Sequence, residues 1–166
     1  IYNYGKNNLM VILFKHVQMK KIITICSLLF SATVFSQNYI NLSKAEVKKQ
    51  LHSYINKNDL AKTSITETDT TLVIKEHSAA STYRFDKKGK CLSEKIIADS
   101  DASFKQNLQM VLDQKKYGWK KINGNQYISG FAEKLMIELA LGQNDFTFII
   151  LRTDWSKEMY DILTAN

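Results

Sequence analysis

The sequence contains no proline and only six glycines among its 166 residues. Flexible linkers are commonly built from these residues, so nothing indicates a linker between two domains. The length suits one domain and is short for two. Hydrophobic residues make up 45% of the chain and charged residues 23%, which is ordinary for a globular protein. We therefore expect one folded domain, over residues 37–166.

A signal peptide is predicted over residues 19–36. Met19 is followed by two lysines, an apolar segment (IITICSLLFSA) and then Val34 and Ser36, the two positions that a signal peptidase reads. The apolar segment is shorter than the ~20 residues of a membrane span, so cleavage before Gln37 is favoured over an uncleaved anchor. Residues 1–18 are interpreted as upstream or mis-started sequence. The mature protein is expected in the periplasm or outside the cell, without a transmembrane span.

Cysteine is scarce, and one of the two cysteines lies in the signal peptide. Cys26 is preceded by Ile25 and followed by further apolar residues, which argues against lipidation. Cys91 is then alone in the mature chain and has no intramolecular disulfide partner. The domain must therefore fold by core packing without a disulfide, which is feasible at this size.

Removal of residues 1–36 lowers the positive charge of the chain. Four of the 23 basic residues and none of the 16 acidic residues lie in that segment, so 19 remain against 16 and the net charge falls from +7 to +3. A basic stripe of the kind that binds nucleic acid is therefore not expected, and export argues against it as well.

The first half of the mature chain reads as a helix followed by strands. Ser43 and Glu46 form a capping box, and apolar residues then recur at helical spacing through Ile55. Short runs rich in Thr, Val, Ile and Tyr follow, and Gly89 suits a hairpin turn. The expected strands are 64–67, 71–76, 81–86 and 91–98.

The second half repeats this order. A helix is expected over 102–116 with a cap at residues 99–101, and Gly118 is expected to end it. Asn123-Gly124 predicts a hairpin between 119–122 and 126–129. The composition of residues 135–141 favours a helix, but their position just before the β-rich segment 146–152 favours a strand. We expect a strand. Residues 146–152 are strongly β, and Thr153 or Asp154 is expected to cap a C-terminal helix.

These elements predict an α+β fold. We expect an antiparallel sheet with helices packed on one face, because an amphipathic helix buries its apolar stripe against a sheet. The helix-then-strands order occurs twice, which suggests a degenerate α-β-β repeat.

One local cluster is a candidate binding site. It interleaves four lysines with two aromatic residues, a combination that can hold an anionic envelope component or an acidic protein through charge and stacking. The alternative is structural: lysines at a helix end and an edge strand, with the aromatic side chains in the core. The residues are Lys115, Lys116, Tyr117, Trp119, Lys120 and Lys121.

Catalytic and metal-binding patterns are weak. Cys91 and His77 could act as nucleophile and base of a small envelope hydrolase, but no known signature surrounds them. His52 and His77 are the only histidines after the signal peptide, too few for a zinc site. We expect no metal and no cofactor, and an enzyme is the less favoured reading.

The segments Leu42–Val47 and Tyr83–Cys91 resemble small periplasmic helix-plus-sheet modules, namely the beta-lactamase-inhibitor-protein-like group and the PepSY-type modules. The resemblance covers about a third of the chain. It implies an α+β module that binds proteins or acts in the cell envelope. The favoured function is an exported binding module for a protein or an envelope component. The alternatives are the Cys91 hydrolase and a structural envelope-assembly factor.

Overall fold

The computed structural model describes residues 39–165 except 59, 61–62 and 141–145. The described residues belong to one compact unit, within Phe35–Asn166. The predicted signal peptide and the segment before it lie outside the described residues. No helix in the described part of the chain has the length and apolar character needed to cross a bilayer.

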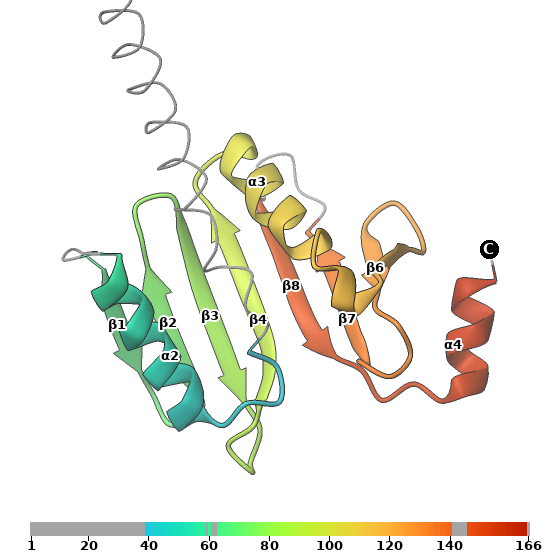
Figure 1. The fold of residues 1–166 in the computed structure, drawn as a ribbon, viewed down its shortest axis with the longest axis horizontal. Coiled ribbons are helices and arrows are strands. Elements are labelled where there is room, and N and C mark those ends of the chain that lie inside the picture. The colour runs from blue at the N-terminus through green and yellow to red at the C-terminus, as the bar shows by residue number, and fades with distance from the viewer. Residues whose placement is uncertain (1–38, 59, 61–62, 141–145, 166) are drawn as a thin grey trace, which may run out of the picture. The chain divides into compact units, whose positions relative to one another are not determined.

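The first half contains helix α2 and four strands (Figure 1). Ser43 caps α2, and its side chain and that of Glu46 form the predicted capping box. The strand predictions hold within a residue or two. The elements are α2 (Lys44–Lys57), β1 (Ser64–Glu67), β2 (Thr71–Lys75), β3 (Ala79–Phe85) and β4 (Cys91–Ala98).

The second half contains a helix, a 3-10 turn, four strands and a last helix. Residues 135–139 form a strand, as predicted. The elements are α3 (Asp101–Leu112), η1 (Lys115–Tyr117), β5 (Lys120–Lys121), β6 (Gln126–Ile128), β7 (Leu135–Leu139), β8 (Thr147–Arg152) and α4 (Lys157–Thr164).

Two predicted helix boundaries were wrong. The helix expected over 102–116 ends at Leu112 because Asp113 caps it, and the chain then tightens into η1 before Gly118 adopts a left-handed φ of 55°. The C-terminal helix begins later than expected, since the Ser156 hydroxyl accepts the Met159 N–H and provides the cap. Trp155 therefore precedes that helix.

The eight strands of the described residues form one antiparallel sheet in the order β1-β2-β3-β4-β8-β7-β6-β5. In each half of the chain, consecutive strands pair as hairpins. The two halves meet at the centre of the sheet, where β4, the last strand of the first half, pairs with β8, the last strand of the second half. The predicted α+β class with an antiparallel sheet is confirmed, and the repeated order has the form helix plus four strands.

The core lies on one face of this sheet. Ile74, Ser81, Ile96 and Phe148 are aligned across the four strands β2, β3, β4 and β8, and all four are buried. Helix α3 contacts this face through Phe104, whose ring packs against Phe148 with centroids 5.9 Å apart.

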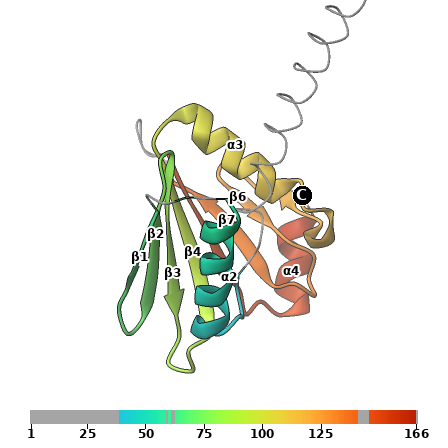
Figure 2. The same cartoon turned by 60° about the vertical axis from the view of Figure 1, so that its left-hand side comes forward.

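Helix α2 contacts the same face at the other end of the sheet. Lys44 forms an ion pair with Glu67 at 2.9 Å, and the Tyr54 hydroxyl donates to Glu76 at 3.2 Å. Val47 and Leu51 are buried beneath the helix. The turned view shows α2 on one side of β1–β3 and α3 across one end of the sheet (Figure 2).

Helix α4 lies on the other side of the sheet from α2 and α3. Ile128 of β6 pairs with Met136, so its side chain belongs to the opposite face, yet it is only 1% exposed. Trp155 and Tyr160 lie around it and account for its burial. Met159 and Ile162 of α4 are 50% and 66% exposed, so the apolar stripe of this helix is not fully covered within the described chain.

Candidate functional site

The structure separates the predicted basic-aromatic cluster into aromatic and basic parts. Tyr117 is 5% exposed and belongs to the core, and Trp119 is half-buried against it with ring centroids 5.7 Å apart. The Trp119 indole nitrogen is buried and has no hydrogen-bond partner among the described residues. These two aromatic rings therefore pack inward and offer little surface for stacking a ligand.

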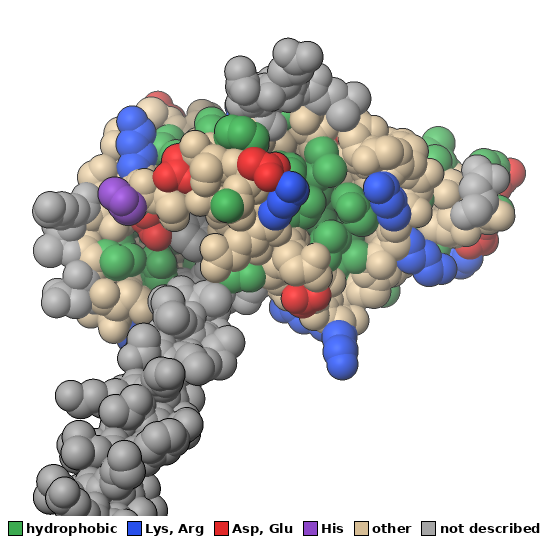
Figure 3. Space-filling model, turned by 90° about the horizontal axis from the view of Figure 1, so that it is seen from above, with side chains coloured by type: hydrophobic (Ala, Val, Ile, Leu, Met, Phe, Trp, Pro, Cys, Tyr) green, Lys and Arg blue, Asp and Glu red, His purple; other side chains and the backbone are tan. Residues whose placement is uncertain are grey.

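The four lysines of the cluster are exposed. Lys116 lies 4.5 Å from the Tyr117 ring centroid, and Lys121 lies 5.8 Å from that of Tyr127. None of the four forms an ion pair within the described part of the chain. Seen from above, hydrophobic side chains gather on the surface with Lys or Arg side chains on either side of them (Figure 3). The lysines are thus exposed around inward-facing aromatic rings, but they do not form one surface, because Lys120 and Lys121 are neighbours on β5 and lie on opposite faces of the sheet.

The structure does not bring Cys91 and His77 together. His77 lies in the turn between β2 and β3, next to the strand end where Ala79 pairs with Ala98. Cys91 lies at the opposite end of this hairpin, paired with Phe85. At ~3.3 Å per residue the two ends are roughly 20 Å apart. His77 is therefore too far from the thiol to act as its base.

Cys91 is also poorly suited to be a nucleophile. It is 0% exposed, and burial together with the nearby Glu94 carboxyl raises the pKa of the thiol to about 12. A reactive cysteine needs the reverse, an accessible thiol with a lowered pKa. Cys91 instead packs in the core beside the strap Asn41–Leu42, whose backbone exchanges hydrogen bonds with it at 2.9 and 2.8 Å.

No group of three or more His, Cys, Asp or Glu side chains is placed to hold a metal ion among residues 39–165 outside the gaps named above. His52 is exposed on α2.

The side of the sheet opposite α2 and α3 carries a surface that the sequence analysis missed. We call it the open face. The strand register assigns to it two rows of aligned residues. One row contains Val73, Thr82, Lys95, Ile149 and Glu138, and the other contains Thr71, Arg84, Ser93, Leu151 and Met136.

Side chains on the open face remain accessible. Arg84, Lys95 and Ile97 are exposed, with Ile97 at 42%. Val73, Thr82, Ile149 and Leu151 are half-exposed, whereas their neighbours on the other face are buried. The two faces of the sheet are therefore covered unequally, and the open face presents apolar side chains together with charged ones.

The charges of the open face are mostly positive. Among the described strand residues it carries four basic side chains and one acidic side chain, and none of the basic ones takes part in an ion pair of the described chain. Lys120 belongs to this face because it pairs with Ile128, which links the predicted cluster to it. The five charged residues are Lys75, Arg84, Lys95, Lys120 and Glu138.

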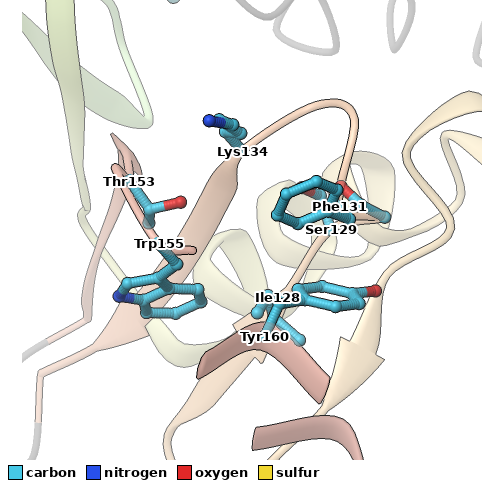
Figure 4. A pocket seen from close by; sticks show the side chains of 8 residues that line it. Ile128, Ser129, Phe131, Lys134, Thr153, Trp155 and Tyr160 are labelled. Atoms are coloured by element: carbon cyan, nitrogen blue, oxygen red, sulfur yellow. The ribbon is translucent and has the colours of Figure 1, made fainter. Parts of the chain in front are cut away.

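A hollow of about 160 Å³, open to solvent, lies at one end of the open face (Figure 4). Its lining includes Ile128, the aromatic residues Phe131, Trp155 and Tyr160, and the polar residues Lys134 and Thr153. The side chains that line it leave no enclosed space for even a water molecule, so it is a shallow depression of the surface and not a binding cavity.

Comparison with known proteins adds no assignment: no family model, no curated protein and no solved structure matches the chain. The resemblance to the two periplasmic groups therefore stays a prediction.

The open face could have been found from the sequence once the strands were assigned. Side chains alternate between the two faces along a strand, so residues two positions apart lie on the same face. Residue 73 therefore lies on the same face as 75, residue 82 on the same face as 84, and residue 95 on the same face as 97. Consecutive hairpins place β2, β3 and β4 side by side. The pairing of β4 with β8, which adds Ile149 and Leu151 to this face, has no local sequence signal.

Proposed function

We propose that this protein is an exported binding module that recognises a protein partner through the open face of its sheet. The supporting observation is the unequal coverage of the two faces. One face is buried under α2 and α3, while the other presents half-exposed Ile149 and Leu151 beside the unpaired cations Arg84 and Lys95. Apolar surface edged by charge is typical of surfaces that associate with other proteins.

The charges favour a partner with an acidic surface. Four cations against one anion give the open face a positive potential, which speeds encounter with acidic proteins and disfavours basic ones. Periplasmic or secreted localisation is part of the proposal and rests on the predicted signal peptide. A hydrolase is not supported, because Cys91 is buried and far from His77.

Site-specific photocrosslinking in the exporting cell tests this proposal. A photoreactive amino acid at Thr82, at the centre of the open face, should form a crosslink to one discrete protein. The matched control is the same amino acid at Lys49, which is exposed on α2. Lys95→Glu should weaken the Thr82 crosslink about tenfold or more, because it places a negative charge against an acidic partner.

Equal crosslinking from Thr82 and Lys49, or none from Thr82, would contradict the proposal. The melting temperature of Lys95→Glu has to match that of the unmodified protein. If it does, a lost crosslink reports on binding and not on folding.

A further inference from the structure

A continuous apolar band runs across the open face along β8. Ile149 and Leu151 of β8 are two residues apart, so both project from this face at a spacing of about 7 Å. Met136 of β7 pairs with Leu151, and Ile97 of β4 pairs with Thr147, the next position of β8 on this face. Ile97 is exposed, and the other three apolar residues are half-exposed. We call Ile97, Ile149, Leu151 and Met136 the apolar band.

Helix α4 covers the continuation of this band at one end. Ile128 of β6 pairs with Met136, so it extends the band by one strand. It is only 1% exposed, because Trp155 and Tyr160 lie around it. Tyr160 belongs to α4, and Trp155 directly precedes this helix. The open face thus already packs against one helix of the chain, and within the described residues α4 leaves the part of the band along β8 accessible.

Charged side chains flank the band on both sides. Lys95 of β4 and Glu138 of β7 both pair with Ile149, one on each side of β8. Because neighbouring strands are about 4.8 Å apart, these two residues stand roughly 10 Å from each other, close to the diameter of an α-helix. Arg84 lies on the β4 side, one strand further out. None of the three charged residues takes part in an ion pair of the described chain. The band is therefore about one helix wide, with its positive charge along the β4 side.

The position of the band restricts the kind of segment that can bind it. Strand β8 is paired with β4 on one side and with β7 on the other, so it has no free edge to which a partner could add a strand (Figure 1). An extended segment laid over the band would hold unpaired backbone N–H and C=O groups against apolar side chains, which is unfavourable. A helix satisfies its backbone groups internally and presents an apolar stripe, so it suits the band.

A second copy of the same face is a poor occupant. Two open faces packed together would bring their four basic side chains near one another, with one acidic side chain on each face among the described strand residues. Like charges brought together in an interface disfavour association. The charges therefore favour a different chain that carries acidic residues.

We propose that the apolar band binds one amphipathic α-helix of the partner protein. The apolar stripe of that helix covers Ile149 and Leu151, and its acidic flank lies over Lys95 and Arg84. From Thr147 to Leu151 the band spans about 13 Å, the length of roughly nine helical residues. The inference rests on the proposed function and adds the form and the charge pattern of the element that is recognised.

Binding of designed peptides to the exported protein tests this inference. The probe is a fluorescein-labelled peptide of about 15 residues, held helical by a side-chain bridge, with leucines at i, i+3, i+4 and i+7 and glutamates along one flank. A second peptide has the same residues reordered so that apolar and polar ones alternate, and a third has lysines in place of the glutamates. The first should bind saturably in fluorescence anisotropy, and the other two about tenfold more weakly or not at all.

Two substitutions in the exported protein locate the binding. Ile149→Thr keeps a β-branched residue in the strand but removes apolar surface, so the affinity should fall about tenfold. Lys95→Glu should weaken binding of the glutamate peptide and strengthen binding of the lysine peptide, an exchange that a loss of folding cannot produce. Lys87→Glu, at an exposed lysine of the β3–β4 hairpin, is the matched control and should not produce this exchange. If Ile149→Thr lowers the melting temperature, the methyl resonances of Ile149 and Leu151 in the unmodified protein should shift on titration and give the same readout.

Four outcomes would overturn the inference: no saturable binding up to millimolar helical peptide, equal binding of the alternating peptide, equal effects of Lys95→Glu and Lys87→Glu, or self-association of the protein alone that Lys95→Glu abolishes. The last of these would assign the band to a second copy. The proposed function fails separately. A Thr82 crosslink that forms although the helical peptide does not bind keeps the open face as the binding surface but removes the helix as the element it recognises.

Discussion

Tyr83 and Glu94 face each other across β3 and β4, and both side chains are 1% exposed. Neither carboxylate oxygen of Glu94 has a well-aligned hydrogen-bond donor among the described residues. Burial raises the pKa of Glu94 to about 8, and the interaction with the Tyr83 hydroxyl acts in the opposite direction without cancelling that rise. Tyr39 covers this pair, with its ring at 5.1 Å and 81° to that of Tyr83. Glu94 is thus a buried acid that the fold keeps protonated.

This arrangement makes the stability of the domain depend on pH. The pKa of Glu94 is higher in the folded chain than the ordinary value of 4.5, so the folded state holds this proton more tightly than the unfolded state. The contribution of Glu94 to stability is therefore fully present below pH 4.5 and declines by up to about 1.4 kcal/mol per pH unit as the pH rises to about 8. Glu94→Gln removes this decline.

Chemical denaturation at pH 5 and pH 8 measures the effect. At each pH, the free energy of unfolding of the unmodified protein is subtracted from that of Glu94→Gln. This difference should be larger at pH 8 than at pH 5, by about 2 kcal/mol or more. Glu138→Gln, an exposed glutamate on β7, is the control and should show no comparable change. A Glu94 variant whose difference is the same at both pH values would show that the carboxyl is ionised or solvated in the folded protein.

Cys91 should not react with alkylating agents in the native protein. It is fully buried, and its raised pKa leaves almost no thiolate at neutral pH. Mass spectrometry after iodoacetamide treatment should show labelling only once the protein is unfolded by denaturant. Labelling of the native protein at the rate of the unfolded chain would show that Cys91 is accessible and would revive the hydrolase hypothesis.

The burial of α2 predicts an asymmetry between its two sides. Leu51 is 2% exposed in the core, so Leu51→Ala should lower the free energy of unfolding by about 2–5 kcal/mol. Lys49 is exposed on the same helix, and Lys49→Ala should change it by less than about 0.5 kcal/mol. Urea denaturation of both variants measures this. Similar values for the two would mean that α2 presents a different side to the sheet.

The predicted processing site lies outside the described residues and needs its own test. N-terminal sequencing of the exported protein should begin at Gln37 or within a few residues of it. A protein that retains Met19 at its N-terminus, or that carries a lipid on Cys26, would contradict both the signal peptide and the localisation.

Local sequence signals were sufficient for most of the elements. The capping box at Ser43 and Glu46, and the glycine at position 89 with a φ of 71°, are interactions between residues close in sequence, so their signals are readable without the fold. The strand at 135–139 was correctly preferred over a helix because of its position between two turns. The end of α3 was misplaced because the α-helix ends at the cap residue Asp113 and the chain continues as the 3-10 turn η1, a change of helix type that propensity does not resolve.

The candidate site was only partly predictable, because lysine exposure follows from local pattern while aromatic exposure does not. Tyr117 and Trp119 occur in a lysine-rich segment, but the register of β5 and the packing of η1 turn their rings inward. The open face and the hollow need residues far apart in sequence, such as Ile128 and Trp155, to lie side by side.

The α+β class and the order of helices and strands can both be derived from the amino-acid sequence, since they depend on local periodicity and composition. The meeting of β4 and β8, the unequal coverage of the two faces and the protonated state of Glu94 arise only in the folded chain. The physical reason is that each depends on long-range contacts. A glutamate in a strand carries no local sign of burial, and its pKa rises only when Tyr83, Tyr39 and the strands around it exclude water.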